Sequence, residues 1–423
     1  MEAIELATLL WASGWAWHAG LRLLRGDRNS LMILYLIFCA EYTAPLALDA
    51  LMGRPEYANQ PGFSVASQDP YVRVLYCAFL FLVPPIWLCG TKVRSRTLRA
   101  PSPQWVVMAL RLGSLLPVFC VWAAPEPSLY LQYAGVMRAN AALDVIVFHI
   151  VVSMATMVAV LCAAGRCLIE RLNKRTIAEI AIAAVLSIWI NGKRYIVAET
   201  LMLLLLALWY RGAVTGKKLA WAALTGALVL AVFSETYQAN VRGISYDALS
   251  SAQAAEGARI DYTRDSRVQM ALYSALYPDK MQILDYPGQN LLYYATLLVP
   301  RSMWSNKPYP YAYYFTSAML NRYPQDFGWG MTTGIFDETI ANVGLAGILL
   351  GPLWIRWFCI VGDSAGGWSV HILTCVVGCL LLSVQLAAFT PLLLIWIFVV
   401  AKNKRIPFWR PSVAGLRGSA VSV

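Results

Sequence analysis

Charged residues are scarce in this sequence. Aspartate, glutamate, lysine and arginine together make up 13% of the 423 residues, whereas 59% are hydrophobic. A soluble domain has about 25% charged and about 45–50% apolar residues, and a stretch of about 20 apolar residues can cross a bilayer core about 30 Å thick. Several such stretches occur here. The composition excludes a soluble domain and predicts an all-α polytopic integral membrane protein.

Histidine and the common catalytic motifs are also scarce. Three histidines occur, each in or beside an apolar segment and each expected to be a core or interfacial residue: His18, His149 and His371. The nine cysteines show neither zinc-ligand spacing nor a disulfide framework. A P-loop, a Gly-x-Ser-x-Gly turn and a His-Glu-x-x-His helix are absent. We expect neither a metal nor a cofactor.

Apolar segments recur along the chain. The first is not a cleavable signal peptide, because Glu2 and Glu5 stand where a basic n-region is needed. About 11 spans, in a range of roughly 10–14, are expected from the hydropathy. The segments are roughly 4–24, 30–51, 71–90, 105–124, 143–164, 176–190, 195–210, 219–235, 335–357, 368–385 and 387–401.

Basic residues set the direction of these spans, because short cytoplasmic loops carry an excess of lysine and arginine. The clusters are Arg22/Arg25/Arg28, Lys92/Arg94/Arg96/Arg99, Arg166/Arg171/Lys174/Arg175, Arg211/Lys217/Lys218 and, in the tail, Lys402, Lys404, Arg405 and Arg410. All lie on one side if the N-terminus is outside, the C-terminus is cytoplasmic and 368–401 breaks near Pro391 into two spans. The net charge of +11 is then a topology signal with some attraction to membrane lipids, and it gives no support for a nucleic-acid partner.

This orientation divides the chain into four parts. Residues 1–235 form an N-terminal transmembrane bundle of about 8 spans, and 236–334 form one long extracytoplasmic loop. Residues 335–401 form the C-terminal transmembrane helices, and 402–423 a basic cytoplasmic tail. Within the loop, the apolar piece 289–300 is too short to span and is expected to be re-entrant or interfacial.

Two pairs of cations lie on the predicted outer side. Lys193 and Arg194, the first cation pair, follow Asn191-Gly192 in a short turn between two spans. They fit either an anion site at membrane depth or a turn whose cations reach lipid phosphates. Glu199 lies a little over one turn further on, as their partner or as a catalytic group.

Arg301 and Lys307, the second cation pair, flank Trp304 in a loop rich in aromatic residues. Aromatic rings can cover the C–H faces of sugars, so Trp304, Tyr313 and Tyr314 are candidate sugar-binding residues. The alternative is an aromatic belt at the membrane interface with cations at the headgroup level.

Acidic residues mark the outer ends of two spans. Asp337 and Glu338 begin the span 335–357, and Glu338 shares a helix face with Asn342. Glu41 and Asp49 lie in the second span. An ionisable group inside a membrane indicates function by default, although Asp49 also fits the outer rim.

Several of these residues form a recognisable pattern. It comprises Asn191-Gly192-Lys193-Arg194, Pro300-Arg301-x-x-Trp304-x-x-Lys307-Pro308, Gly334 and Glu338-x-x-x-Asn342-x-Gly344-x-x-Gly347. In these motifs, over about 190–194 and 300–347, and in hydropathy over most of its length, the chain resembles the bacterial oligosaccharide repeat-unit polymerases (Wzy-type O-antigen polymerases).

The resemblance implies a metal-independent membrane glycosyltransferase with a GT-C-like architecture. The donor would be a glycan on undecaprenyl pyrophosphate, and the acceptor a repeat unit on the same lipid. The transfer would occur at the periplasmic face of the bacterial inner membrane and build O-antigen, capsule or exopolysaccharide. A chain-length regulator would be a further partner.

Residue roles follow from the same resemblance. Both cation pairs are expected to bind the pyrophosphate and stabilise its developing charge. The acceptor hydroxyl must lose a proton, so a carboxylate base is expected. Glu338 is the first candidate, followed by Asp337 and Glu199.

Two other functions stay open. A lipid-linked oligosaccharide flippase or transporter would have short loops and charged groups lining its spans, whereas here cations, acids and aromatics gather in one exterior stretch. An O-antigen ligase is usually described with an outward-facing histidine in a long periplasmic loop, and no histidine lies between residues 150 and 370.

Overall fold

The computed structural model describes residues 2–91, 104–138, 142–241, 251–297, 299–323, 326 and 329–404, and within these ranges all regular secondary structure is helical. The predicted basic residues Lys92, Arg94, Arg96, Arg99, Arg405 and Arg410 lie outside the described residues.

The N-terminal half contains twelve α-helices and two short helices of other types. They are α1 (Glu2–Leu24), α2 (Ser30–Phe38), the π-helix η1 (Cys39–Thr43), α3 (Ala44–Met52), α4 (Pro61–Gln68), α5 (Pro70–Leu88), α6 (Gln104–Ser114), α7 (Leu116–Trp122), the 3-10 helix η2 (Pro127–Leu131), α8 (Gly135–Arg138), α9 (Leu143–Ile169), α10 (Lys174–Asn191), α11 (Arg194–Arg211) and α12 (Lys217–Val241).

The C-terminal half begins with short helices and ends with long ones. They are α13 (Ser251–Tyr262), α14 (Asp265–Leu276), α15 (Gln289–Ala295), α16 (Tyr311–Leu320), α17 (Ile335–Val343), the 3-10 helix η5 (Gly344–Ala346), α18 (Gly347–Ser364), α19 (Trp368–Ser383), the 3-10 helix η6 (Leu386–Phe389) and α20 (Thr390–Lys404).

Six of the described helical segments are long and apolar enough to cross a membrane, or seven if the α6–α7 pair, bent by 45°, counts as one span. They are Ser30–Met52, Pro70–Leu88, Asp144–Ile169, Lys217–Tyr237, Ile335–Ser364 and Leu386–Asn403. The described chain is therefore all-helical, with six or seven helices suited to a membrane, rather than the eleven expected.

The shortfall from eleven has physical causes. Helices also cover the other predicted segments, as α1, α10, α11 and α19, but α19 has only 16 residues. Charged side chains lower the hydropathy of the other three: Glu2, Glu5 and Arg22 lie in α1, Lys174, Arg175 and Glu179 in α10, and Arg194, Glu199 and Arg211 in α11. Eleven spans and their orientation stay a prediction.

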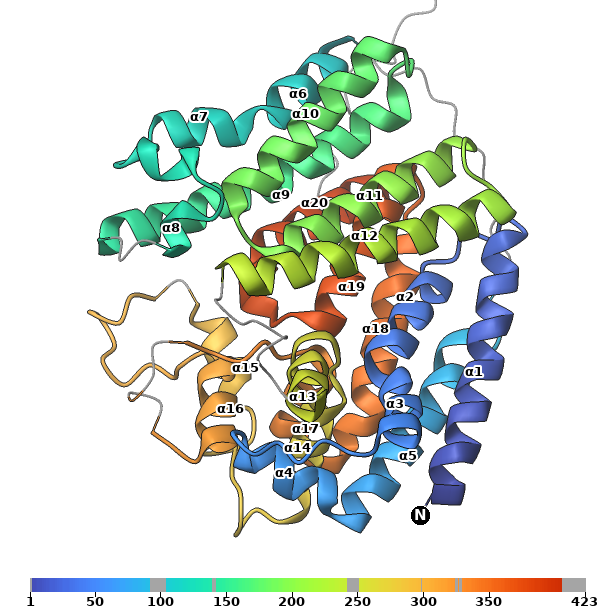
Figure 1. The fold of residues 1–423 in the computed structure, drawn as a ribbon, viewed down its shortest axis with the longest axis vertical. Coiled ribbons are helices and arrows are strands. Elements are labelled where there is room, and N and C mark those ends of the chain that lie inside the picture. The colour runs from blue at the N-terminus through green and yellow to red at the C-terminus, as the bar shows by residue number, and fades with distance from the viewer. Residues whose placement is uncertain are drawn as a thin grey trace, which may run out of the picture.

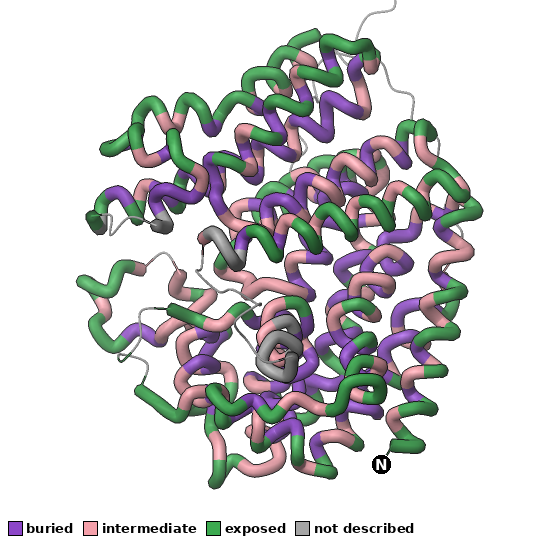
Figure 2. Tube along the Cα trace, viewed as in Figure 1, coloured by how far each residue is buried: buried purple, intermediate pink, exposed green. Residues whose placement is uncertain are grey.

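The main core lies among α2, α5, α18 and α19, which run side by side in Figure 1. Aromatic rings fill its centre, where Phe336 of α17 lies 5.8 Å from Phe38 and 5.0 Å from Phe79 between ring centroids. A second, smaller core holds together η2, α8, α9 and the end of α10, with Tyr130, Val152 and Ile190 buried in it. By contrast, α12 is exposed along most of its length in Figure 2.

The predicted loop 236–334 is folded into short helices at one end of the molecule (Figure 1). Helix α12 continues to Val241, past the predicted end at 235, and the apolar piece 289–300 begins with the seven-residue helix α15. Helix α14 packs against α4, α5 and α17, so this region is joined to the ends of long helices. Further along, α19 ends at Ser383, η6 follows, and Pro391 lies in the first turn of α20, so the expected break is present.

Candidate functional site

The first cation pair stands on a tightly built turn. Helix α10 ends at Asn191, and Gly192 follows with a φ of +67° in the left-handed region. A Cβ atom at Gly192 would lie 2.8 Å from the Cα atom of Ala134, so only glycine fits without a shift. Asn191 is fully buried, and its Nδ2 donates to Thr156 Oγ1 at 2.7 Å and to the hydroxyl of Tyr195 at 3.1 Å. The turn therefore holds the two cations in place.

Of the two cations, Arg194 binds a carboxylate among the described residues and Lys193 does not. Arg194 Nη2 donates to Asp261 Oδ1 of α13 at 2.7 Å, and its guanidinium lies 5.4 Å from the ring centroid of Tyr262. Its buried Nη1 has no hydrogen-bond partner among the described residues. Lys193 makes neither an ion pair nor a hydrogen bond with any residue that the structure describes, and burial lowers the pKa of its ammonium. Among the residues that the structure describes, this turn thus has more positive than negative charge.

A histidine lies beside this turn. His149 of α9 is buried, and the positive charge of Lys193 acts on its imidazole. Its Nδ1 lies 3.4 Å from the hydroxyl of Tyr130, and its Nε2 lies 3.4 Å from Ser153 Oγ. The sequence did not suggest this neighbourhood, because His149 precedes the turn by more than forty residues.

A relay of contacts leads from Arg194 to Glu41. The backbone oxygen of Asp261 accepts from Arg264 Nη1 at 3.4 Å, and the backbone N–H of Arg264 donates to the carbonyl of Glu41 at 2.9 Å. Ser383 Oγ donates to Glu41 Oε1 at 2.5 Å, while the buried Oε2 has no partner among the described residues. Glu41 lies in the π-helix η1, a helix type that often marks functional positions.

Arg267 of α14 ties this relay to the segment before α17. It is 2% exposed, and it donates to the carbonyls of Thr332 at 2.6 Å, Thr263 at 2.6 Å and Ile260 at 2.8 Å. The charges of Arg264 and Arg267 act on the carboxylates of both Glu41 and Asp337. Nothing in the sequence patterns singled out these arginines, although Arg259, Arg264 and Arg267 recur within nine residues of the predicted extracytoplasmic loop.

The two acids at the start of α17 have different surroundings. Asp337 Oδ1 accepts from the backbone N–H of Gly334 at 2.8 Å, so this carboxylate closes the first turn of its own helix. Glu338 is 4% exposed, and its Oε2 accepts from Asn290 Nδ2 at 3.0 Å and from the hydroxyl of Tyr294 at 2.9 Å. Glu338 therefore binds α15, the helix that begins the predicted re-entrant piece.

The remaining acid candidate, Glu199, lies apart on α11. It is 4% exposed, and neither of its carboxylate oxygens has a hydrogen-bond partner among the described residues. Arg194 is paired with Asp261 instead, so the expected pairing of Glu199 with the first cation pair is not seen.

The donors of the second cation pair bind the backbone of their own loop. Lys307 is buried, and its Nζ donates to the carbonyls of Leu297 at 3.0 Å and Val299 at 2.9 Å. Arg301 donates to the carbonyls of Lys307 at 2.7 Å and Pro308 at 2.9 Å. In this structure the pair closes the 297–308 loop, and its role in anion binding stays a prediction.

Tyrosine rings surround this loop. Arg301 lies 4.1 Å from the ring centroid of Tyr309, which stacks on Tyr313 at 6.0 Å. The hydroxyl of Tyr314 accepts from Gln289 Nε2 at 3.0 Å, and Trp304 is half-buried. Burial raises the pKa of Tyr314, so this hydroxyl stays neutral and able to donate. Of the predicted sugar-binding rings, Trp304 lies in the loop, whereas Tyr313 and Tyr314 lie in the first turn of α16, where Tyr314 contacts Gln289 of α15.

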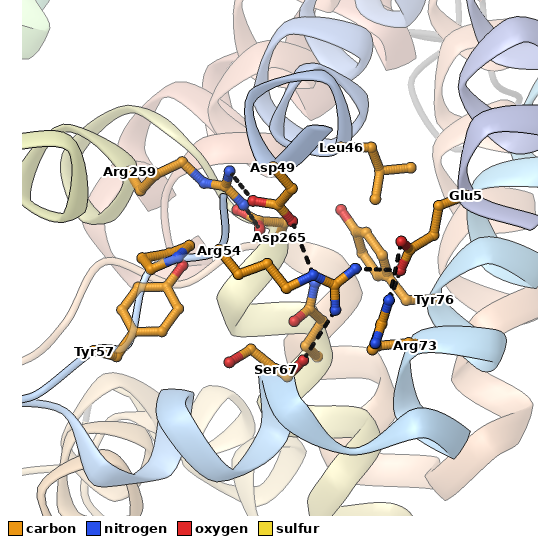
Figure 3. A pocket seen from close by; sticks show the side chains of 12 residues that line it. Glu5, Leu46, Asp49, Arg54, Tyr57, Ser67, Arg73, Tyr76, Arg259 and Asp265 are labelled. Carbon is orange, nitrogen blue, oxygen red and sulfur yellow. Dashed lines mark hydrogen bonds and ion pairs between the residues drawn. The ribbon is translucent and has the colours of Figure 1, made fainter. Parts of the chain in front are cut away.

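An outer ion-pair cluster joins α13 and α14 to the N-terminal helices (Figure 3). It comprises Glu5, Asp49, Arg54, Arg73, Arg259 and Asp265. In Figure 3, Arg54 reaches between Asp49 and Glu5, and Arg259 binds Asp49 at 2.6 Å and Asp265 at 2.6 Å. The space between the side chains is about 10 Å³, which is room for one water. Because three acids meet three arginines there, this cluster is a structural joint.

Taken together, these contacts link polar residues of distant helices. A chain of contacts runs from the first cation pair to Glu41, and Arg267 binds the carbonyl of Thr332, shortly before Asp337 and Glu338. The second cation pair lies in the loop that follows α15. No described contact joins the two cation pairs directly, and no group of three His, Cys, Asp or Glu in the described ranges is arranged to hold a metal ion. Comparison of the chain with known protein families, with curated proteins and with solved structures finds no match.

Proposed function

We propose that the chain is a membrane glycosyltransferase, an oligosaccharide repeat-unit polymerase. It would transfer a growing glycan from undecaprenyl pyrophosphate to a repeat unit on the same lipid, at the outer face of a bacterial inner membrane. The observation that carries the proposal is the first cation pair. Two cations are held in a built turn where, among the described residues, one carboxylate binds Arg194 and none binds Lys193, and a chain of contacts leads from that carboxylate's residue to Glu41.

The charge balance of this turn suits a pyrophosphate leaving group. The acceptor hydroxyl attacks the anomeric carbon of the donor sugar, and the bond from that carbon to the pyrophosphate oxygen breaks. Negative charge then grows on the pyrophosphate. Lys193 and the unpaired Nη1 of Arg194 supply donors that need little reorganisation, and such preorganised donors can each contribute roughly 10²–10³ in rate.

A carboxylate must take the proton of the acceptor hydroxyl. Glu338 stays the first candidate for this general base, because Asn290 and Tyr294 orient its carboxylate toward α15. Glu41 joins as a second candidate, since its Oε2 is buried and has no partner among the described residues. Asp337 is less suited, because one of its oxygens already caps α17.

One observation favours a second function. A ligase, which moves the glycan to another acceptor lipid, is described with an outward histidine, and His149 lies beside Lys193 in this structure. His149 belongs to α9 rather than to a long loop, and it is buried. We therefore keep the polymerase as the proposal and the ligase as the alternative.

Reconstitution tests the proposal. The purified full-length protein in lipid vesicles receives defined lipid-linked repeat units, without nucleotide or added metal. Growth of chains, seen as a ladder on a gel, is expected. A folded protein that leaves the repeat units unchanged, or that only moves them across the bilayer, would overturn the polymerase assignment.

A further inference from the structure

An apolar crevice opens beside the first cation pair, between the outer ends of α10 and α12. It has a volume of about 250 Å³ and is lined by Tyr133, Val185, Ile188, Trp189, Phe233, Thr236 and Tyr237. Three aromatic rings frame it, because Tyr133 lies 5.7 Å from Trp189 and 6.2 Å from Phe233 between ring centroids. The crevice is thus preformed and chiefly apolar.

The crevice faces the surroundings of the helices rather than the core. Val185 is 61% exposed and Trp189 is 43% exposed. Helix α12 is exposed along its length in Figure 2, and only 6% of its apolar window is buried. Because α12 is one of the helices suited to span a membrane, these side chains meet lipid chains, and a hydrocarbon chain can enter the crevice from the side.

The polar end of the crevice is the first cation pair. Trp189 lies in the last turn of α10, just before the turn that carries Lys193 and Arg194. Tyr133 precedes Ala134, which contacts Gly192 directly, and Tyr237 acts electrostatically on Arg194. The apolar crevice therefore ends at two cations, and Asp261 is the carboxylate that binds one of them among the described residues. This combination matches a lipid with an anionic phosphate head and a hydrocarbon tail.

We propose that this crevice holds the first part of the isoprenoid chain of the pyrophosphate-linked substrate, with the pyrophosphate on Lys193 and Arg194. The inference rests on the proposed function for the identity of that lipid. In this arrangement the lipid enters sideways between α10 and α12. The crevice then holds the isoprenoid chain at a set distance from the cations that bind the pyrophosphate.

Binding to the full-length protein in nanodiscs tests the inference with two probes, an isoprenyl pyrophosphate and inorganic pyrophosphate. Val185→Trp fills the crevice. Val232→Trp is the matched control, because Val232 is similarly exposed at 57% on α12 but does not line the crevice. Val185→Trp is expected to weaken isoprenyl pyrophosphate binding by at least about tenfold, the cost of losing roughly two buried methylene groups, and to leave inorganic pyrophosphate binding unchanged.

Other outcomes overturn the inference. Unchanged binding of the isoprenyl probe by Val185→Trp would show that the chain lies elsewhere, and an equal loss of both probes would show a distorted turn. Equal competition by phosphatidylglycerol would make the crevice a general phospholipid site. Chain growth by the wild-type protein is measured in parallel. If Val185→Trp shows the selective loss of isoprenyl pyrophosphate binding but the wild-type protein grows no chains, the proposed function is refuted and the crevice assignment stands.

Discussion

Arg194 is the residue on which the candidate site depends most. Asp261 binds only one of its donors, Nη2, among the described residues. The other terminal nitrogen, Nη1, is buried and has no hydrogen-bond partner in the described chain. A partly buried cation with a buried, unpartnered donor is costly unless an anion binds that donor. The proposed pyrophosphate would supply that anion, so removal of the guanidinium should act on the reaction more than on folding.

We predict that Arg194→Ala lowers polymer formation by roughly 10²–10³, since a preorganised donor to the leaving group is lost. The length and amount of the polysaccharide ladder on a gel measure it, with protein level in the membrane recorded alongside. Arg175→Ala is the control, because Arg175 is an exposed arginine paired only with Glu179. A normal ladder from Arg194→Ala would remove the anion site from this turn.

Glu338 can be separated from its rivals by an isosteric change. Glu338→Gln keeps the volume and part of the hydrogen bonding to Asn290 and Tyr294, but it cannot take a proton. We predict a loss of chain growth of roughly 10²–10⁴ with retained donor binding. If Glu338→Gln grows chains normally while Glu41→Gln does not, the base is Glu41.

Among the helical elements, the turn from α10 to α11 is the most constrained. Both Gly192 and Gly212 end a helix with positive φ, at +67° and +79°, but their surroundings differ. A Cβ at Gly192 would meet Ala134 at 2.8 Å, whereas nothing lies within 4 Å of one at Gly212. The two positions therefore separate backbone strain from steric contact.

We predict that Gly212→Ala destabilises the protein by about 1–2 kcal/mol through left-handed backbone strain alone. Gly192→Ala should cost about 1–3 kcal/mol more, because Ala134 must move. Thermal unfolding of the purified protein in detergent measures both. Equal losses of stability would mean that the turn is looser than the structure shows.

At the scale of the whole molecule, the short outer helices are attached to the long ones by buried ion pairs. Arg259 of α13 bridges Asp49 of α3 and Asp265 of α14, and it also donates to the carbonyl of Pro45. Arg54 belongs to the same outer ion-pair cluster, but its side chain is 28% exposed, compared with 6% for Arg259. The more buried arginine, Arg259, should therefore contribute more to the stability of the fold.

We predict that Arg259→Gln destabilises the protein by about 3–5 kcal/mol, because Asp265 is left buried without its ion-pair partner and Asp49 keeps only its 3.9 Å contact with Arg54. Arg54→Gln should cost about 0–1 kcal/mol, as for an exposed pair. Limited proteolysis of α13 and α14 in vesicles, together with thermal unfolding, measures the difference. Similar behaviour of the two variants would argue against this joint.

Composition and spacing alone determined the class of the protein. Scarce charge and long apolar runs require helices in a membrane, because only there are backbone polar groups and apolar side chains both satisfied. The position of Lys193 and Arg194 in a short turn between two predicted spans singled out the first cation pair, and i,i+4 spacing placed Glu338 and Asn342 on one face, where Asn342 donates to the carbonyl of Glu338.

Only the tertiary structure decided which of these charged residues meet. Arg194 pairs with Asp261 and not with Glu199, and Lys307 binds carbonyls of its own loop, because side-chain partners depend on contacts between distant segments. Sequence reasoning named Glu41 but not its partners Arg264 and Arg267, since these contacts depend on how α14 packs against the long helices. The surplus of positive charge was visible in the sequence, but the place where it stays unbalanced depends on packing.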